Sequence, residues 1–160
     1  MKTRYLFSHK YKFFGWIIFS IGMMLGLVLS LNEFDYPSWY VNVFPLIGEG
    51  EGLLSRNESL TWSENNIADE LTSLLIIIGG ILVAFSKVKQ EDEYSETIRT
   101  ESLIWATYVN YIVLVLSILF IYDMPFFHVM IYNMFTILLF FILRFHYMMY
   151  KSKKLMINEE

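Results

Sequence analysis

The fold of this chain is decided by residues 101–145, which read ESLIWATYVNYIVLVLSILFIYDMPFFHVMIYNMFTILLFFILRF. The stretch holds two apolar runs of about 20 residues each, the length of α-helix that spans the hydrocarbon core of a bilayer. Only Asp123, Met124 and Pro125 separate the two runs. Because so short a connection forces the chain to reverse at once, the stretch predicts an antiparallel pair of membrane helices joined by a tight turn.

The composition of the whole chain agrees with an apolar environment. Of its 160 residues, 56% are hydrophobic and 18% are aromatic, whereas soluble domains are about 45–50% apolar. Long runs without a charged residue recur along the chain, which a soluble core of this size does not need. We therefore expect an all-α fold: one membrane domain, residues 1–160, with four transmembrane helices in an antiparallel bundle. The expected spans are residues 13–31, 67–86, 102–122 and 126–147, with loops at 32–66 and 87–101.

The basic residues predict the orientation of this bundle. Loop 32–66 contains a single basic residue, Arg56, and all others fall within residues 1–12, 87–99 and 144–154. With four spans these three clusters lie on one side, which the positive-inside rule assigns to the cytoplasm. We expect a multi-pass protein of the cell membrane with both termini and loop 87–101 cytoplasmic and loop 32–66 outside.

Small residues recur at helical spacing in the first two spans, and small side chains let helix backbones approach closely in lipid. They are Gly22, Gly26 and Ser30 in the first span and Thr72, Gly80 and Ala84 in the second. We expect the two faces to pack on each other, and self-association between copies of the chain is the alternative.

Three polar residues lie inside the third and fourth spans: Asn110, Asn133 and Thr136. An asparagine in hydrocarbon needs a hydrogen-bond partner, so all three should face the bundle interior. Counted from the outer boundary, Asn110 lies about 18 Å deep, Asn133 about 10 Å and Thr136 about 15 Å. These depths favour a bond from Asn110 to Thr136 over direct contact between the amides. Hydrogen bonding between helices is one interpretation, and a polar ligand or ion site is the other.

Charged residues suggest two further contacts near the ends of the spans. Glu101 and Arg144 come from opposite ends of the helical pair and fall at the same depth, which predicts an ion pair. Asp69, Glu70, Asp123 and His128 lie near the outer boundary and are weak candidates for a divalent metal site. The simpler explanation of the first two is that they occupy the first turn of a helix capped by Asn65 or Asn66.

Loop 32–66 carries six carboxylates and only one basic residue. Its aromatic part, residues 34–44, predicts a short interfacial helix or turn.

Several classes of site are not expected from this sequence. The chain has no cysteine, which excludes disulfides and thiolate metal sites. A retinal linkage needs a lysine within a span, whereas Lys87 lies at the end of one. A haem held by two histidines needs both at matching depth within the spans, whereas His9 lies before the first expected span and His146 at the very end of the fourth. No phosphate-binding or protease motif occurs. We expect no cofactor, and the thin scatter of basic residues argues against nucleic-acid binding.

Three functional hypotheses follow from these features. The leading one is a non-catalytic integral membrane protein that acts as an accessory, scaffold or regulatory subunit, with the bilayer and another membrane protein or a second copy as partners. The second is a small oligomeric channel or carrier with a path lined by Asn110, Asn133 and Thr136. The third is a membrane enzyme that uses the outer Asp, Glu and His residues.

Overall fold

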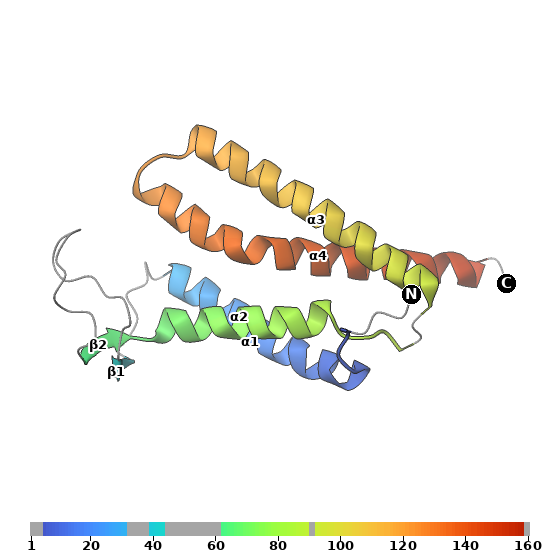
Figure 1. The fold of residues 1–160 in the computed structure, drawn as a ribbon, viewed down its shortest axis with the longest axis horizontal. Coiled ribbons are helices and arrows are strands. Elements are labelled where there is room, and N and C mark those ends of the chain that lie inside the picture. Colours follow the sequence, from blue (N-terminus) through green and yellow to red (C-terminus); the bar gives the residue numbers. More distant parts are fainter. Residues whose placement is uncertain (1–4, 32–38, 44–61, 90–91, 159–160) are drawn as a thin grey trace.

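The computed structural model describes residues 5–31, 39–43, 62–89 and 92–158. Figure 1 shows the elements in chain order: α1 (His9–Leu31), β1 (Tyr40–Val43), β2 (Ser63–Asn66), α2 (Ala68–Ala84), α3 (Glu93–Phe120) and α4 (Met124–Asn158). Helices α1, α3 and α4 are long and apolar enough to cross a membrane. Helix α2 has 17 residues, or about 26 Å at the usual helical rise.

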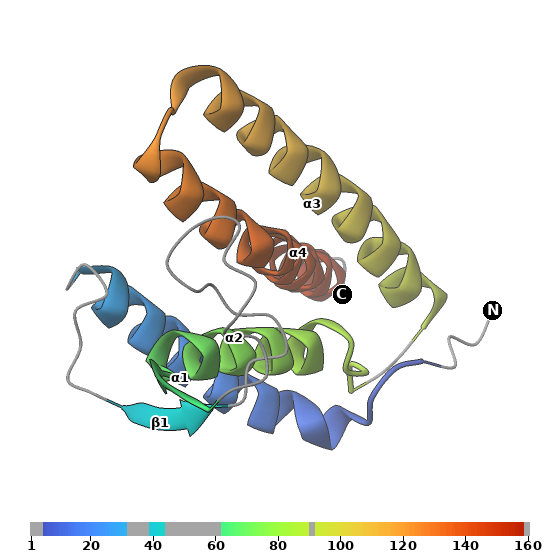
Figure 2. The same cartoon turned by 60° about the vertical axis from the view of Figure 1, so that its left-hand side comes forward.

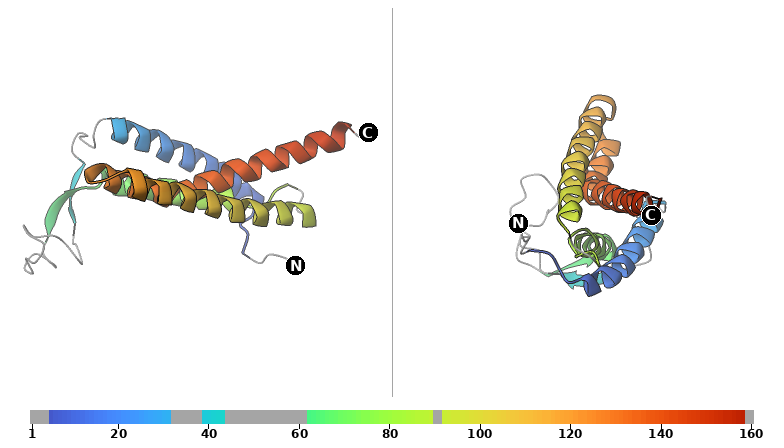
Figure 3. Two further views of the ribbon diagram at one scale, coloured as in Figure 1. Left: turned by 90° about the horizontal axis from the view of Figure 1, so that it is seen from above. Right: turned by 90° about the vertical axis from the view of Figure 1, so that its right-hand side faces the viewer.

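The helices form two hairpins that meet through α2 and α4. Helix α1 packs along α2, α3 packs along α4, and α2 contacts α4 (Figures 1 and 2). One end of the molecule, which we call the turn end, carries β1, β2 and the connection 121–123 between α3 and α4 (Figure 1). At the opposite end, the terminal end, α1 begins and α4 ends, and the last turns of α4 extend past α2 (Figure 3).

The burial pattern of α3 is inverted relative to that of a helix in a soluble protein. Its buried residues are mostly small or polar: Ser95, Ile98, Arg99, Ser102, Ala106, Asn110 and Ser117. Its outward side chains are large and apolar, and Ile112 and Leu119 are 58% and 57% exposed. In water this arrangement would forfeit about 25 cal/mol for each Å² of apolar surface left unburied. It is the arrangement expected when the surrounding solvent is lipid.

The most tightly buried part of the structure lies toward the terminal end. Phe141 and Phe145 of α4 are stacked with ring centroids 5.9 Å apart, and Phe85 stacks on Phe141 at 5.6 Å. The Phe145 ring is fully buried. The Lys12 Nζ lies 5.7 Å and the Arg99 guanidinium carbon 5.1 Å from its centroid. Cation–π contacts therefore join α1 and α3 to α4 through one aromatic ring.

Helices α1 and α2 approach so closely that glycine is required at their contact. A Cβ built on Gly79 would lie 2.4 Å from the backbone nitrogen of Phe19. A Cβ on Gly22 would lie 2.9 Å from the backbone nitrogen of Ile76, and one on Gly15 would lie 2.7 Å from the Leu82 Cβ. Each distance is too short for a real side chain, so any larger residue must push the helices apart.

Some, but not all, of the small residues expected to pack between the first two spans lie at the contact between α1 and α2. Gly22 and Gly26 of α1 face α2 as expected, and Thr72 is buried beside Gly26. Gly80 instead lies between the Phe19 ring and Leu138 of α4, so α2 presents Gly79 to the α1 backbone. Two adjacent glycines cannot share one helical face, and the sequence does not say which of the two turns toward α1. The two other members of the expected set, Ala84 and Ser30, lie in the buried core and against α4, respectively.

Loop 32–66 differs from the interfacial helix or turn expected at residues 34–44. Residues Tyr40–Val43 form a strand that pairs antiparallel with Ser63–Asn66, with Tyr40 opposite Asn66. Residues 34–38 and 44 lie outside the described part of the chain. The alternating Val41 and Val43 favour a strand, but the paired residues lie 20 to 26 positions away along the sequence, so the local pattern did not reveal the pairing.

Helix boundaries depart from the expected spans at both sides of loop 87–101. Helix α3 begins at Glu93, where the Asp92 side chain accepts a hydrogen bond from the Ser95 backbone N–H at 2.8 Å. This N-cap holds the pKa of the Asp92 carboxyl below its usual value, because the bonds from Ser95 favour the charged form. The segment before α1 lies against residues 85–87: the Phe7 N–H donates to the Phe85 carbonyl at 2.9 Å.

The start of α2 uses the polar residues expected there in a different way. Its N-cap position is Ile67, and Asn66 belongs to β2. The Asn66 side chain nevertheless accepts a bond from the Ala68 N–H at 3.2 Å, and the Asn65 amide donates to Glu70 Oε1 at 2.9 Å. The polar groups ahead of α2 therefore tie β2 to the first turn of the helix.

Candidate functional site

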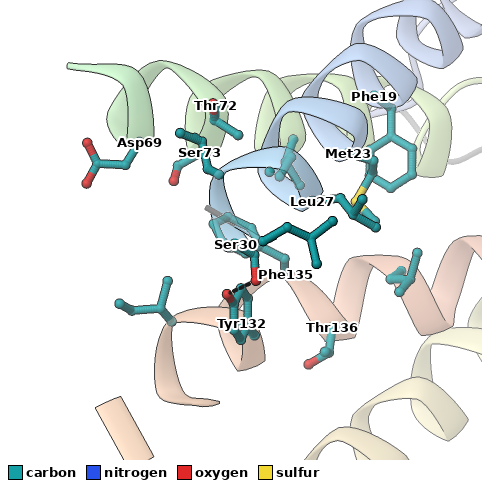
Figure 4. Close-up of a pocket in the computed structure, with 16 residues that line it drawn as sticks. Phe19, Met23, Leu27, Ser30, Asp69, Thr72, Ser73, Tyr132, Phe135 and Thr136 are labelled. Carbon is teal, nitrogen blue, oxygen red and sulfur yellow. Dashed lines mark hydrogen bonds between the residues drawn. The ribbon is translucent and has the colours of Figure 1, made fainter. Parts of the chain in front are cut away.

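A cleft of about 450 Å³ lies between α1, α2 and α4 toward the turn end (Figure 4). It exists because, of the first hairpin, only α2 makes extensive contact with α4, so α1 and the turn-end half of α4 stand apart. Most of its wall is apolar. The lining residues are Phe19, Met23, Gly26, Leu27, Leu29, Ser30 and Leu31 of α1, Asp69, Thr72, Ser73 and Ile76 of α2, and Ile131, Tyr132, Phe135, Thr136 and Leu139 of α4.

Hydroxyl groups in the cleft wall are mostly satisfied within the protein. The Tyr132 hydroxyl donates to Ser30 Oγ at 2.7 Å and closes the cleft on one side by linking α4 to α1 (Figure 4). The Thr72 hydroxyl donates to the Ala68 carbonyl at 2.7 Å. Asp69 is exposed at the rim and points away from the apolar wall (Figure 4). The cleft therefore presents an apolar surface with one carboxylate at its outer edge.

The three polar residues of the last two helices form one cluster. Asn110 Nδ2 donates to Asn133 Oδ1 at 3.3 Å, and Asn133 Nδ2 donates back to Asn110 Oδ1 at 3.4 Å. The Thr136 hydroxyl donates to Asn110 Oδ1. Contact between Asn110 and Thr136 matches the expectation, whereas the expectation against direct contact between the amides is wrong.

The error in that expectation comes from the helix boundaries. Helix α3 ends at Phe120 and α4 begins at Met124, each two residues away from the expected limit. Measured from these ends, Asn110 lies about 15 Å and Asn133 about 14 Å from the turn. A shift of two residues in each helix thus brings both amides to one level. Thr136 also lines the cleft, so the cluster supports the cleft wall from behind.

The expected ion pair between Glu101 and Arg144 does not form in the described structure. The guanidinium carbon of Arg144 lies 4.8 Å from the centroid of the Trp105 ring instead. Arginine stacks well on indole because its planar cation is weakly hydrated. The sequence placed both charges at similar depth but gave no indication that the ring of Trp105, four residues along α3, would contact the guanidinium instead.

The candidate metal ligands are not assembled into a site. Within residues 5–31, 39–43, 62–89 and 92–158, no group of three or more His, Asp or Glu side chains could hold a metal ion. Asp69 and Glu70 lie in the first turn of α2. Asp123 occupies the turn before α4 with a φ of 59°, and the Nδ1 of His128 lies 3.1 Å from the Met124 carbonyl oxygen.

The cleft itself was not expected from the sequence. Residues Phe19, Met23 and Ser30 recur at helical spacing on α1, which indicates a shared face. A shared face does not reveal whether another helix of the same chain covers it. Comparison with known proteins adds no candidate ligand, since no family model, curated protein or solved structure matches the chain.

Proposed function

We propose that this chain is a non-catalytic integral membrane protein that works as an accessory or regulatory subunit, and that its cleft receives a transmembrane helix of a partner protein. We further propose that α1 to α4 all cross the cell membrane, with the terminal end of the molecule in the cytoplasm.

The elongated shape of the cleft is the observation that supports a helix as its occupant. Along α1 its wall runs from Phe19 to Leu31, or about 18 Å at the helical rise, which is more than three turns of helix. Walls come from three helices that run roughly parallel or antiparallel (Figure 3). Leu27 and Leu31 are 62% and 75% exposed, so the cleft is open toward the surrounding lipid.

The chemistry of the wall narrows the kind of helix that fits. Helices associate in lipid by close packing and by hydrogen bonds rather than by hydrophobic burial. The hydroxyl groups of Ser30 and Thr72 are engaged within the chain, which leaves shape as the main determinant. Asp69 at the rim favours a partner with Lys or Arg where its helix leaves the membrane at the turn end.

A matched pair of substitutions tests this proposal. Leu27→Trp fills the cleft, and Ile112→Trp adds the same side chain to an outward face of α3. We expect a stoichiometric partner to co-purify with the wild-type chain and with Ile112→Trp from native membranes, and to be lost with Leu27→Trp. Equal recovery with both variants, or no stoichiometric partner at all, would contradict the proposal.

The absence of cysteine makes the orientation directly testable. Single cysteines at the exposed positions Asn42 and Lys89 report the turn end and the terminal end, respectively. A membrane-impermeant thiol reagent added to intact cells should label the Asn42→Cys variant and not the Lys89→Cys variant. The reverse pattern would show that the orientation is opposite to the one proposed. Labelling of both variants would contradict the proposal that α1 and α2 span the membrane as a hairpin.

The other two hypotheses receive less support from the described residues. A channel path needs polar groups free to face permeating ions, whereas Asn110, Asn133 and Thr136 bond to one another between adjacent helices. An enzyme needs converging acid, base or nucleophile groups. Asp69 and His128 come instead from separate helices, and His128 already contacts its own helix backbone.

A further inference from the structure

A second groove, of about 400 Å³, lies between α3 and α4 toward the terminal end. Its lining residues are Trp105 of α3 and Phe140, Leu143, Arg144, Tyr147 and Met148 of α4. Leu143 and Tyr147 are 57% and 63% exposed, so the groove opens sideways, away from the helical core. Its wall is apolar except for one cation.

That cation is Arg144, and no acceptor in the described residues forms a hydrogen bond with its N–H groups. Its guanidinium stacks on Trp105, with the central carbon 4.8 Å from the ring centroid. No hydrogen bond or ion pair joins it to another residue that the structure describes, Glu101 included. A guanidinium carries five N–H donors in a fixed plane, and stacking uses the face of that plane while its edge remains available. An arginine at membrane depth normally finds an anion or a polar partner for these donors.

The position of Arg144 along α4 places this charge at a membrane boundary. Helix α4 begins at Met124, and 20 residues of helix rise about 30 Å, the thickness of the hydrocarbon core. Arg144 therefore lies at the boundary opposite the turn. Long side chains on a helix point back toward its N-terminus, which directs the guanidinium toward Trp105 on the hydrocarbon side of this boundary. There it lies directly beneath the lipid glycerol and phosphate groups, within reach of a headgroup phosphate.

We propose that this groove binds one anionic phospholipid of the cytoplasmic leaflet, with its phosphate on the Arg144 guanidinium and an acyl chain along Leu143 and Phe140. The proposal rests on the membrane placement given above, but not on the occupant of the cleft. Charge complementarity selects the anionic headgroup, because Arg binds phosphate through two parallel N–H donors. The sideways opening and apolar wall select a lipid over a soluble phosphate. Basic pockets between transmembrane helices on the cytoplasmic side are typical sites for such headgroups.

Lipid retention by the purified full-length chain tests the proposal. The protein is equilibrated in dodecylmaltoside micelles with equal amounts of phosphatidylglycerol and phosphatidylcholine, and bound lipid is counted by native mass spectrometry. Wild type should retain one phosphatidylglycerol in preference to phosphatidylcholine. Arg144→Gln should lower that preference about tenfold, equivalent to about 1.4 kcal/mol. Lys154→Gln removes the same charge from another face of α4 and should leave the preference unchanged.

Two further variants separate the headgroup site from the acyl-chain site. Arg144→Lys keeps the charge and should retain most of the preference for phosphatidylglycerol. It is the control for Arg144→Gln, because a loss caused by misfolding at this position would occur in both variants. Leu143→Trp fills the apolar wall and should reduce retention of both lipids. Inorganic phosphate at millimolar concentration should not displace the lipid if the acyl chain contributes.

Three results would overturn the proposal. They are an unchanged preference in Arg144→Gln, an equal loss in Lys154→Gln, and complete displacement by inorganic phosphate. None of them bears on whether the cleft binds a helix, since Leu27→Trp tests that in native membranes. A chain that fails to enter membranes at all would remove both proposals, and the cysteine labelling detects that case separately.

Discussion

Replacing Gly79 by alanine tests the close approach of α1 and α2, on which the first hairpin depends. The new Cβ would lie 2.4 Å from the backbone nitrogen and 2.7 Å from the Cα of Phe19. Both atoms belong to the backbone, so no rotation of a side chain relieves the clash. Carbon contacts are optimal at about 3.5–4.0 Å, and the two helices must therefore separate locally by about 1 Å.

The cost of that separation follows from the contacts that it weakens. A gap of 0.5–1 Å forfeits about a quarter to a half of each dispersion contact. Some tens of atom pairs at about 0.1–0.2 kcal/mol each then give a loss of about 1–3 kcal/mol, which is the usual range for overpacking. In lipid the hydrophobic effect does not change this loss, because the surfaces exposed when the helices separate move from protein into hydrocarbon rather than into water.

A graded series of glycine substitutions supplies the controls. A Cβ on Gly22 would lie 2.9 Å from the Ile76 nitrogen, whereas one on Gly26 would lie 3.4 Å from its two nearest atoms, both in side chains. We therefore expect the loss of stability to decrease from Gly79→Ala to Gly22→Ala, and Gly26→Ala to be neutral within about 0.5 kcal/mol. The measurement is reversible unfolding in mixed micelles of dodecylmaltoside and sodium dodecyl sulfate, followed by far-ultraviolet circular dichroism.

The order of the three variants decides the outcome. If Gly79→Ala is as stable as Gly26→Ala, the backbones of α1 and α2 do not approach as described, and the explanation of the first hairpin fails. If all three lose stability equally, the loss does not follow the contact distances, and the explanation of the first hairpin fails as well.

Three more predictions concern the second hairpin. Asp123 has a φ of 59°, so Asp123→Gly should be neutral or stabilising, while Asp123→Val should lose about 1–2 kcal/mol in the same unfolding assay; equal stability of the two variants would contradict the left-handed turn. The pKa of the Asp92 carboxyl is held below its ordinary 3.8 in the folded chain, so its contribution is complete above that pH and is lost as the pH falls through the lower folded value. The hydrogen-exchange protection factor of the first turn of α3, which corrects for the pH dependence of intrinsic amide exchange, should therefore fall below about pH 4. Asp92→Asn, which still caps, should remove this dependence; an unaltered pH profile of the protection factor in Asp92→Asn would assign the effect to another group. Asn110→Leu should weaken the packing of α3 on α4 by about 1 kcal/mol, and a more stable variant would mean that the amide cluster serves a purpose other than packing.

The sequence alone was sufficient where a property depends on local length and composition. Charge-free apolar runs predicted helices that can cross a membrane, and α1, α3 and α4 meet that criterion. The short interval around Asp123 predicted the tight connection that residues 121–123 form. The need of Asn110 for a partner in hydrocarbon predicted its bond to Thr136. These inferences used only the helical rise and the cost of an unsatisfied polar group. Both quantities are independent of how the helices are arranged.

Only the tertiary structure decided which of several equivalent partners each residue meets. It turned Gly79 rather than Gly80 toward α1, and it set Trp105 against Arg144 in place of Glu101. It also paired Tyr40 with Asn66. The cleft and the groove arise in the same way, because a helix rotation of one residue, about 100°, changes every lateral neighbour while it leaves length and composition unaltered. Periodicity in the sequence defines the faces of a helix, and the packing of all four helices determines which of those faces remain uncovered.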